Sequence, residues 1–353
     1  MNFIKKSIAV AAILSATVAV AQESKTVFSG NADFYYRYNF ANTGNLATNN
    51  LTSFTNSNDS FELGMASIKA SHKEGKASVF ADLGFGNRAK EFTYNDANQE
   101  FMIKQLNMTY EFSPKFKVTA GAFATHLGYE LVDAVDNKNY SMSYAFTNGP
   151  FFNTGVKVQY TAGKISIMAG LTNPTDFKTA LAAKSNQKTV IAQFGYTEDT
   201  GSIFLNFTSG STNPQTDNKQ QIDLVATKKL NDKFTLGING TYATVSSDSP
   251  GVDSKNWFSG ILYAQYAVAK NSSLAYRFEY LSDKDGALVM NGANILDNNI
   301  IANTLSMNFK EGKFTFIPEI RFDMSSQEIF AKNRALDPSK NTASILFATT
   351  YSF

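Results

Sequence analysis

Apolar and polar residues alternate along most of this chain with a period of two, and this pattern limits the fold more than any other feature. In residues 27–40 every second position is apolar or small, and the positions between them are mostly polar. Successive side chains of a strand point to opposite faces, so a period of two over this length predicts a strand. The same alternation returns in residues 105–112, 221–227, 234–239 and 344–353.

The length of these segments predicts that the strands cross a membrane. Each covers roughly 9–12 residues, which is what a tilted strand needs to span a bilayer. Beyond residue 21 no apolar run approaches the ~20 residues of a spanning helix, so residence in a membrane would be through strands. The 30 Phe and 16 Tyr exclude a disordered chain, and the absence of Cys excludes disulfides and thiolate metal sites.

Connections of two lengths alternate along the chain and predict the number of strands. Seven short turns lie at residues 73–75, 113–115, 161–163, 198–201, 231–233, 270–272 and 311–312. Eight longer polar stretches lie at about 41–60, 87–100, 126–151, 173–187, 209–218, 245–256, 284–298 and 325–341. The chain is therefore predicted to form an all-β, transmembrane, antiparallel up-and-down β-barrel of sixteen strands, with short periplasmic turns and long extracellular loops.

One segment tests this count. Residues 139–146 have some strand character, and a strand there would give seventeen, an odd number. It would also move the tight turn at residues 161–163 to the side of the long loops. We therefore assign residues 126–151 to one loop, the third, which is a candidate for folding into the lumen.

The N-terminus reads as a secretory signal peptide. Lys5 and Lys6 precede an apolar run of residues 8–20, and Ala-Val-Ala at residues 19–21 matches a signal-peptidase site. The apolar run is too short for a spanning helix. We expect cleavage after Ala21 and one β-barrel domain over residues 22–353. Without the two lysines the 30 basic residues balance the 30 acidic ones, so no nucleic-acid partner is indicated.

Aromatic residues on the apolar face gather near the predicted strand ends, as at the two interfaces of a bilayer. Those near the turns are Phe112, Phe116, Tyr160, Phe234, Phe309, Phe314 and Phe353. Those near the loops are Tyr36, Tyr38, Phe40, Phe207, Tyr242, Tyr280 and Phe322. A soluble β-sandwich is the alternative, but it rarely carries apolar faces through sixteen consecutive strands with alternating loop lengths.

Three stretches in the middle of the chain resemble a known family. Residues 121–130 read GAFATHLGYE, residues 136–141 read DNKNYS, and residues 149–156 read GPFFNTGV. Together they resemble the second family of putative β-barrel porins, the OmpL-like group. The resemblance implies an outer-membrane porin of a Gram-negative bacterium. Met142 and Asn153 depart from the family, which commonly has a basic residue and a His there.

The predicted barrel suggests a channel. Sixteen strands enclose more space than side chains can fill, so an aqueous lumen remains unless loops close it. We expect passive diffusion of small polar solutes, with selectivity set by the narrowest ring of charges. The inward candidates are Arg37, Lys69, Asp82, Lys157, Arg277, Glu279, Glu319 and Arg321. Their mixed sign argues against strong ion selectivity, and each is alternatively a wall charge in a cross-strand pair.

The third loop is the candidate constriction. Its candidate residues are His126, Tyr129, Glu130, Asp133, Asp136, Asn137 and Tyr140. Acidic residues outnumber basic ones there, and in the lumen they would face wall cations such as Arg37 or Lys157 and set up a transverse field. The alternative is an ordinary surface loop.

Other chemistry has little support in the sequence, and we expect no catalytic residues, metal or cofactor. His126 and Glu130 are four residues apart, but a third ligand is missing. A closed barrel that acts as a receptor, adhesin or complex subunit is the main alternative, followed by an outer-membrane hydrolase. The expected partners are outer-membrane lipid, small polar solutes and the barrel-assembly machinery, to which the resemblance assigns Phe353. A homo-oligomer is a further option.

Overall fold

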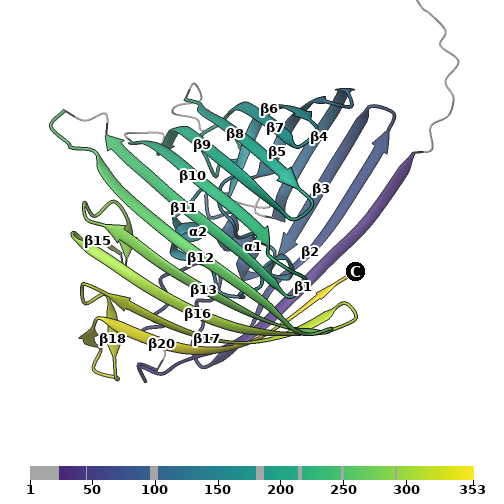
Figure 1. Ribbon diagram of the computed structural model, residues 1–353. Helices are drawn as coiled ribbons and strands as arrows, with labels where there is room; N and C mark the ends of the chain where they lie inside the picture. The colour runs from purple at the N-terminus through teal and green to yellow at the C-terminus, as the bar shows by residue number, and fades with distance from the viewer. Residues whose placement is uncertain are drawn as a thin grey trace, which may run out of the picture.

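A closed antiparallel barrel dominates the computed structural model, which describes residues 24–44, 46–95, 102–179, 187–213, 217–247, 250–290 and 292–353. In this part of the chain sixteen strands pair with their neighbours in chain order (Figure 1). The first half comprises β1 Lys25–Asn39, β2 Ser60–Glu74, β3 Ala77–Phe85, β4 Ile103–Ser113, β5 Phe116–Ala124, β6 Phe152–Ala162, β7 Ile165–Thr172 and β8 Thr189–Glu198. The second half comprises β9 Gly201–Asn213, β10 Asp217–Lys229, β11 Phe234–Ser247, β12 Lys255–Ala269, β13 Ser272–Asp283, β16 Asn298–Glu311, β17 Phe314–Ser325 and β20 Asn341–Ser352. The predicted fold class is confirmed.

Short elements lie in the loops between these strands. The second loop contains helix α1, Asn87–Phe92, and the third contains the 3-10 turn η2, Ala134–Asp136, and helix α2, Tyr144–Asn148. Two small hairpins, β14 Val289–Met290 with β15 Ala293–Asn294 and β18 Phe330–Lys332 with β19 Asp337–Ser339, lie in the last two long loops. No helix among the described residues is long and apolar enough to cross a membrane.

The last strand closes the barrel against the first. β20 pairs antiparallel with β1, from Asn31 opposite Ser352 to Asn39 opposite Ser344. The backbones of Gly30 and Phe353 exchange two hydrogen bonds of 3.0 and 3.2 Å. A Cβ atom on Gly30 would lie 2.5 Å from a ring carbon of Phe353, so only glycine lets this ring lie flat on the strand.

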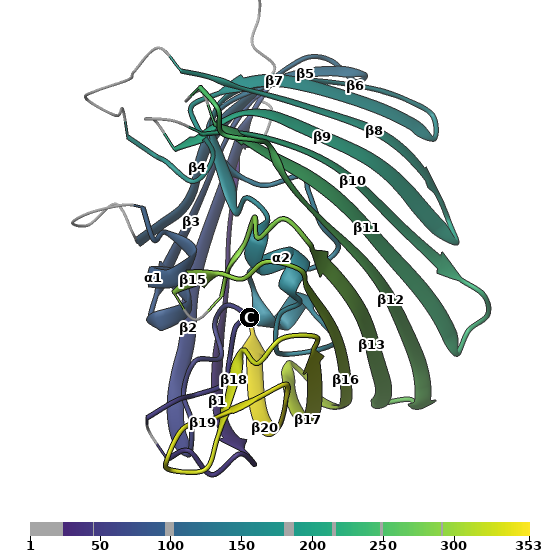
Figure 2. The same cartoon turned by 90° about the vertical axis from the view of Figure 1, so that its left-hand side faces the viewer.

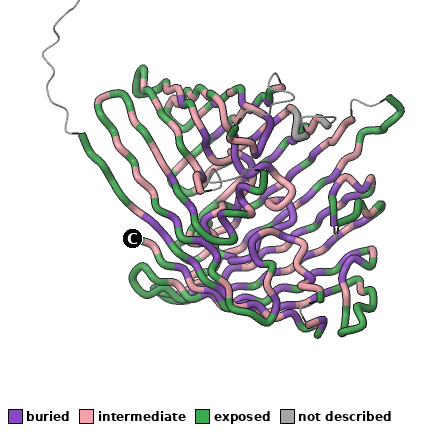
Figure 3. The backbone as a smooth tube through the Cα atoms, turned by 180° about the vertical axis from the view of Figure 1, so that it is seen from behind, coloured by how far each residue is buried: buried purple, intermediate pink, exposed green. Residues whose placement is uncertain are grey.

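The two faces of the wall are the reverse of those in a soluble protein. Along β1 the side chains of Asn31, Asp33, Arg37 and Asn39 are buried, whereas Phe28 is 70% exposed. This alternation of buried and exposed residues runs along the strands (Figure 3). Polar residues thus face the interior and apolar residues face outward, as in a barrel surrounded by lipid.

The predicted connections need one change. Residues 209–218, expected to be a long loop, are mostly strand, because β9 reaches Asn213 and β10 begins at Asp217. Strand ends that project beyond the bilayer need no apolar face, so their polar sequence resembles that of a loop. The alternative strand at residues 139–146 is absent, and its second half belongs to α2. The predicted signal peptide, residues 1–21, lies outside the described residues.

Candidate functional site in the barrel lumen

Residues 125–151, the third loop, run inside the barrel, where α2 lies surrounded by strands (Figure 2). The loop first follows the wall formed by β9, β10 and β11. The ring Nε2 of His126 lies 3.0 Å from the carbonyl oxygen of Phe207, and Gly128 N donates to Asp223 at 2.9 Å. Tyr129 then stacks on Tyr263 of β12, with 4.0 Å between ring centroids. The loop is therefore attached to the wall from its first residues.

A buried ion pair fixes the next part of the loop to β13. Arg277 Nη1 donates to Glu130 Oε1 at 2.5 Å and to the carbonyl oxygen of Ser141 at 2.6 Å. The other oxygen of Glu130 accepts from the backbone N–H and the hydroxyl of Ser143, both at 2.8 Å. Glu130 thus joins two parts of the loop to the same arginine.

A second charged cluster ties the loop to the opposite side of the barrel. Asp133 pairs with Lys69 of β2 at 2.5 Å and also with Lys104 of β4. Lys104 in turn lies 3.0 Å from Asp82 of β3. Burial raises the pKa of the Asp133 carboxyl, but the ammonium groups of Lys104 and Lys69 outweigh burial and lower it below its ordinary value. Asp133 therefore stays ionised while it holds the two lysines.

Carboxylates of the wall accept hydrogen bonds from the backbone of the loop. Glu319 accepts from Tyr140 N at 2.7 Å and Ser141 N at 3.1 Å. Glu279 accepts from Tyr144 N and Ala145 N, both at 2.8 Å, at the first turn of α2. Buried backbone N–H groups require partners, and a loop lacks the partners that a sheet would supply. These acidic residues therefore act as docking points for the loop.

Side chains of the first and second loops complete the attachment. Arg88 of α1 is fully buried, lies 3.7 Å from Asp33, and has its guanidinium 5.0 Å from the centroid of the Tyr140 ring. The hydroxyl of Tyr140 donates to the same Asp33. Arg321 donates to the carbonyl oxygen of Met142 at 2.7 Å and to Asp323 at 2.9 Å. Arg321 also donates to the hydroxyl of Thr52 in the first loop at 3.2 Å, so three loops meet in one polar network.

Two predicted contacts of the third loop are wrong. Arg37 does not face the loop's carboxylates, because its Nη1 donates to the carbonyl oxygens of Thr48 and Ser57 in the first loop, at 2.9 and 3.1 Å. Lys157 lies over the ring of Phe123, with its Nζ 4.1 Å from the centroid. The first loop occupies the space in front of Arg37, and the carboxylates reach Lys69, Lys104 and Arg277 instead.

The remaining candidates of the third loop stay at its edge. Asn137 hydrogen-bonds the backbone of Leu131 and closes a small turn, with Leu131 N donating at 3.0 Å. Asp136 belongs to η2, and burial together with the nearby charge of Asp133 raises the pKa of its carboxyl. In the described part of the chain, no group of three or more His, Asp or Glu side chains is placed so that it could hold a metal ion.

Several residues of this network were not among the predicted candidates. Asp33 and Asp223 occupy inward positions of the alternation, so the pattern marks them, and Lys219 shares its phase with Asp223. Lys104 lies where the pairing of β3 with β4 shifts between Asp82 and Leu83, and such a bulge breaks the alternation that would have revealed it. Arg88 sits in a loop and carries no local signal.

Open space remains on both sides of the third loop. A cavity of ≈ 480 Å³ lies at the loop end of the barrel, between α2 and the wall of β8 to β12. A second cavity, of ≈ 190 Å³, lies at the turn end beside Lys138, Lys270 and Lys310. A pocket of ≈ 10 Å³ bordered by Tyr129, Glu130 and Lys138 adjoins the second cavity. Residues of the third loop line all three of these spaces.

Solved porin structures share this architecture. An anion-selective porin from Comamonas acidovorans superposes with a TM-score of 0.62 at 11% identity, covering 94% of this chain and 100% of that porin. OmpT of Vibrio cholerae in its trimer form superposes with a TM-score of 0.62 at 10% identity, covering 94% of this chain and 100% of OmpT. The outer membrane channel DcaP of Acinetobacter baumannii superposes with a TM-score of 0.59 at 9% identity, covering 94% of this chain and 97% of DcaP. At sequence identities of 9–11%, these superpositions show similarity of fold alone.

The sequence family was identified independently of the fold. A comparison with curated proteins found no match. The family model described as "Putative beta-barrel porin-2, OmpL-like" matches residues 25–353, which includes every strand of the barrel. With the closed sixteen-stranded barrel and the loop-lined lumen, this match shows that the chain belongs to the OmpL-like family of putative β-barrel porins.

Proposed function

We propose that this protein is a porin of the outer membrane of a Gram-negative bacterium, and that small polar solutes diffuse through it passively. The observation that carries the proposal is the third loop, which is fixed inside the barrel by ion pairs on opposite walls and leaves cavities at both ends. A loop held in this way narrows a lumen without filling it. The family and the apolar outer face support the membrane location.

The narrow part of the pathway sets the expected solutes. Tyr129, Glu130 and Lys138 border the pocket of ≈ 10 Å³, and Tyr129 is held in place by stacking on Tyr263. The charge of Glu130 is compensated by Arg277. Compensated charge attracts neither sign of ion strongly. We therefore expect passage of small uncharged and weakly charged solutes, with low ion selectivity.

We also propose how the protein is oriented in the membrane. β1 begins at Lys25 and β20 ends at Ser352, both at the turn end of the barrel, and export through the signal peptide expected at residues 1–21 would leave this end in the periplasm. Phe353 is 57% exposed at this end, where the barrel-assembly machinery can recognise it. The apolar outer surface contacts lipid. Since OmpT of Vibrio cholerae was solved in a trimer form, a homotrimer is the assembly to test first.

Recordings from planar bilayers test the channel directly. The purified protein should give stable ohmic steps in KCl, and liposomes that contain it should swell in small sugars. Deletion of residues 131–145 removes Asp133, Tyr140 and most contacts with the wall, so the conductance should rise several-fold. Asp232→Asn is the matched control, because Asp232 lies in an exposed turn and should leave the conductance unchanged.

Other outcomes would support the alternatives. A silent barrel that binds a ligand would be a receptor or complex subunit, and the dense packing around Tyr140 makes this the stronger alternative. Turnover of lipid or peptide that is lost in His126→Ala would indicate an enzyme. We expect no turnover: burial lowers the pKa of His126 to about 4, and its Nε2 faces the carbonyl of Phe207.

A further inference from the structure

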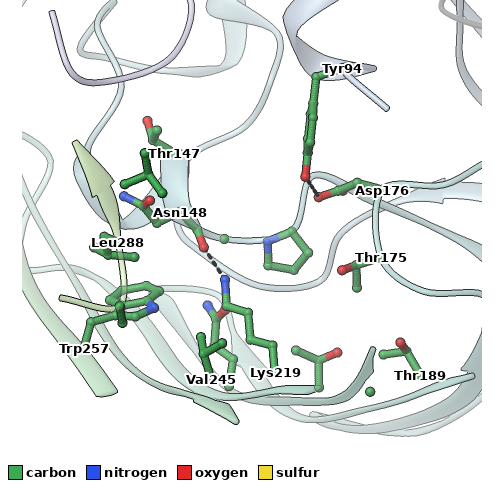
Figure 4. A pocket seen from close by; sticks show the side chains of 17 residues that line it. Tyr94, Thr147, Asn148, Thr175, Asp176, Thr189, Lys219, Val245, Trp257 and Leu288 are labelled. Atoms are coloured by element: carbon green, nitrogen blue, oxygen red, sulfur yellow. Dashed lines mark hydrogen bonds between the residues drawn. The ribbon is translucent and has the colours of Figure 1, made fainter. Parts of the chain in front are cut away.

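The large cavity at the loop end has the composition of a binding site. It is lined by polar side chains of strands β8, β9 and β10, by Trp257 of β12, and by apolar residues that include Val245 and Leu288 (Figure 4). The other apolar lining residues are Pro150, Ala287 and Val289. A volume of ≈ 480 Å³ lies in the range of sites for small molecules, which are concave and mostly apolar with a few polar groups.

Four buried polar atoms of this lining have no hydrogen-bond partner. They are the hydroxyls of Thr189 and Thr208, Oε1 of Gln221 and Nε1 of Trp257. These side chains are 1–4% exposed. An unpaired buried polar group costs about 1–3 kcal/mol, so such groups are normally bonded to protein, water or ligand. Their concentration around one cavity indicates that an occupant supplies the missing partners.

The charge of the cavity points to the kind of occupant. Lys219 Nζ donates to the carbonyl oxygen of Asn148 at 2.5 Å and lies 5.5 Å from the centroid of the Trp257 ring. Within the described part of the chain no carboxylate forms an ion pair with it. The side chain of Lys219 is half-buried. An ammonium group that is withdrawn from water normally has an anionic partner, because desolvation without one is costly.

Asp176, the other charged residue of the lining, is already engaged. One of its oxygens accepts from Phe151 N at 2.7 Å and Phe152 N at 2.9 Å, and the other accepts from the hydroxyl of Tyr94 at 3.0 Å. It therefore holds the end of the third loop. The donors without a partner are Trp257 Nε1 and the hydroxyls of Thr189 and Thr208, and the ammonium group of Lys219, which has three N–H donors, keeps donors beyond the one given to Asn148.

We propose that this cavity binds a small organic carboxylate with an apolar body. The carboxylate would pair with Lys219 and accept from Trp257 Nε1 and Thr208, while the body would contact Val245 and Leu288. The inference goes beyond the proposed diffusion of solutes, because binding at the loop end requires no passage through the constriction. It remains testable in detergent even if no current is observed in bilayers.

The single tryptophan of the chain gives a direct signal. Butyrate at constant ionic strength should change the fluorescence of Trp257 in a saturable way, and butyramide, its uncharged isostere, should not. Lys219→Gln should weaken butyrate binding at least tenfold, whereas Lys219→Arg should retain part of it. Lys157→Gln is the matched control, since Lys157 is also an inward lysine but lies outside the cavity.

Other results would overturn the proposal. Equal binding of butyramide or glucose would make this a site for neutral solutes, and unchanged affinity in Lys219→Gln would exclude the ion pair. A complete lack of saturable binding would refute the site itself. If Lys219→Gln does not fold, Thr208→Val and Trp257→Phe replace it, with calorimetry as the readout. Each should then weaken butyrate binding severalfold, and wild-type affinity in both would overturn the proposal.

Discussion

Charged side chains are paired on one side of the lumen, and a lysine on the other side is not. On β2 to β4 and on β13 and β17, basic and acidic side chains pair with one another or with the third loop, as Lys104 does with Asp133 and Arg277 with Glu130. On β8 to β12, Lys219 has no such pair and faces a cavity. The comparison indicates that paired charges hold the loop, while an unpaired charge beside open space is available to a solute.

The largest expected effect comes from breaking the pair on β13. Arg277→Met leaves the carboxylate of Glu130 buried and uncompensated, which should lower the free energy of unfolding by about 3–5 kcal/mol. Urea titration of the protein in lipid vesicles, followed by the fluorescence of Trp257, measures this change. Adding Glu130→Gln should restore part of the loss. Additive losses in the double variant would show that the two residues do not act as a pair.

A smaller effect is expected on the opposite wall. Asp133→Asn removes the anion shared by Lys69 and Lys104, but an amide can still accept hydrogen bonds, so the stability loss should be about 1–3 kcal/mol. The lumen also becomes more positive, so the reversal potential in a KCl gradient should move toward that of chloride. Asp232→Asn, at an exposed position, should change neither the stability nor the reversal potential. If the reversal potential of Asp133→Asn moved toward that of potassium, the assignment of Asp133 as a lumen anion would be contradicted.

On the side of the cavity, the stability of the protein should depend on pH through Asp176. Burial raises the pKa of Asp176 from 3.8 to about 6, against the opposing effect of hydrogen bonds from Phe152, Phe151 and Tyr94. The folded protein thus binds this proton more tightly than the unfolded chain does. Wild type should therefore become more stable relative to Asp176→Asn as the pH falls from about 6 to about 4.

Urea titrations of both proteins at several pH values provide the measurement, and a difference that moves the other way would contradict the raised pKa. The difference in the free energy of unfolding between wild type and Asp232→Asn should stay nearly constant from about pH 6 to about pH 4. Lys229 lowers the pKa of Asp232 below 3.8, so its titration falls below the window.

The smallest effect is expected where a lysine is neither paired nor part of the cavity. Lys157→Gln removes only a contact with the ring of Phe123, so the stability should change by less than about 0.5 kcal/mol. A loss as large as that of Asp133→Asn would mean that unpaired lumen lysines also hold the structure. The distinction between the two sides would then fail.

The barrel itself was predictable from the sequence because its signal is local. Whether Asn31 or Phe28 faces lipid is decided by strand periodicity within a few residues, and turn residues mark the hairpins. The same local signal fails where the membrane imposes no apolar face, as in residues 209–218, and where a bulge shifts the phase, as at Lys104.

The interior network could be predicted only in outline. The third loop was a candidate because of its length and its acidic residues, but Glu130 and its partner Arg277 are 147 positions apart in sequence. No local pattern selects Arg277 over Arg37 as the partner. That choice depends on which strand the loop reaches and on the first loop, which occupies the space in front of Arg37.

The contacts of Tyr140 have a consequence for how the molecule forms. Its hydroxyl bonds Asp33 on the first strand, while its backbone N–H bonds Glu319 on the strand before the last. These two strands become neighbours of one another, through β20, only when the sheet has closed. The contacts of Tyr140 with both strands can therefore form only at the end of folding. Once formed, they help to hold β1 beside β20, the two strands whose pairing closes the barrel.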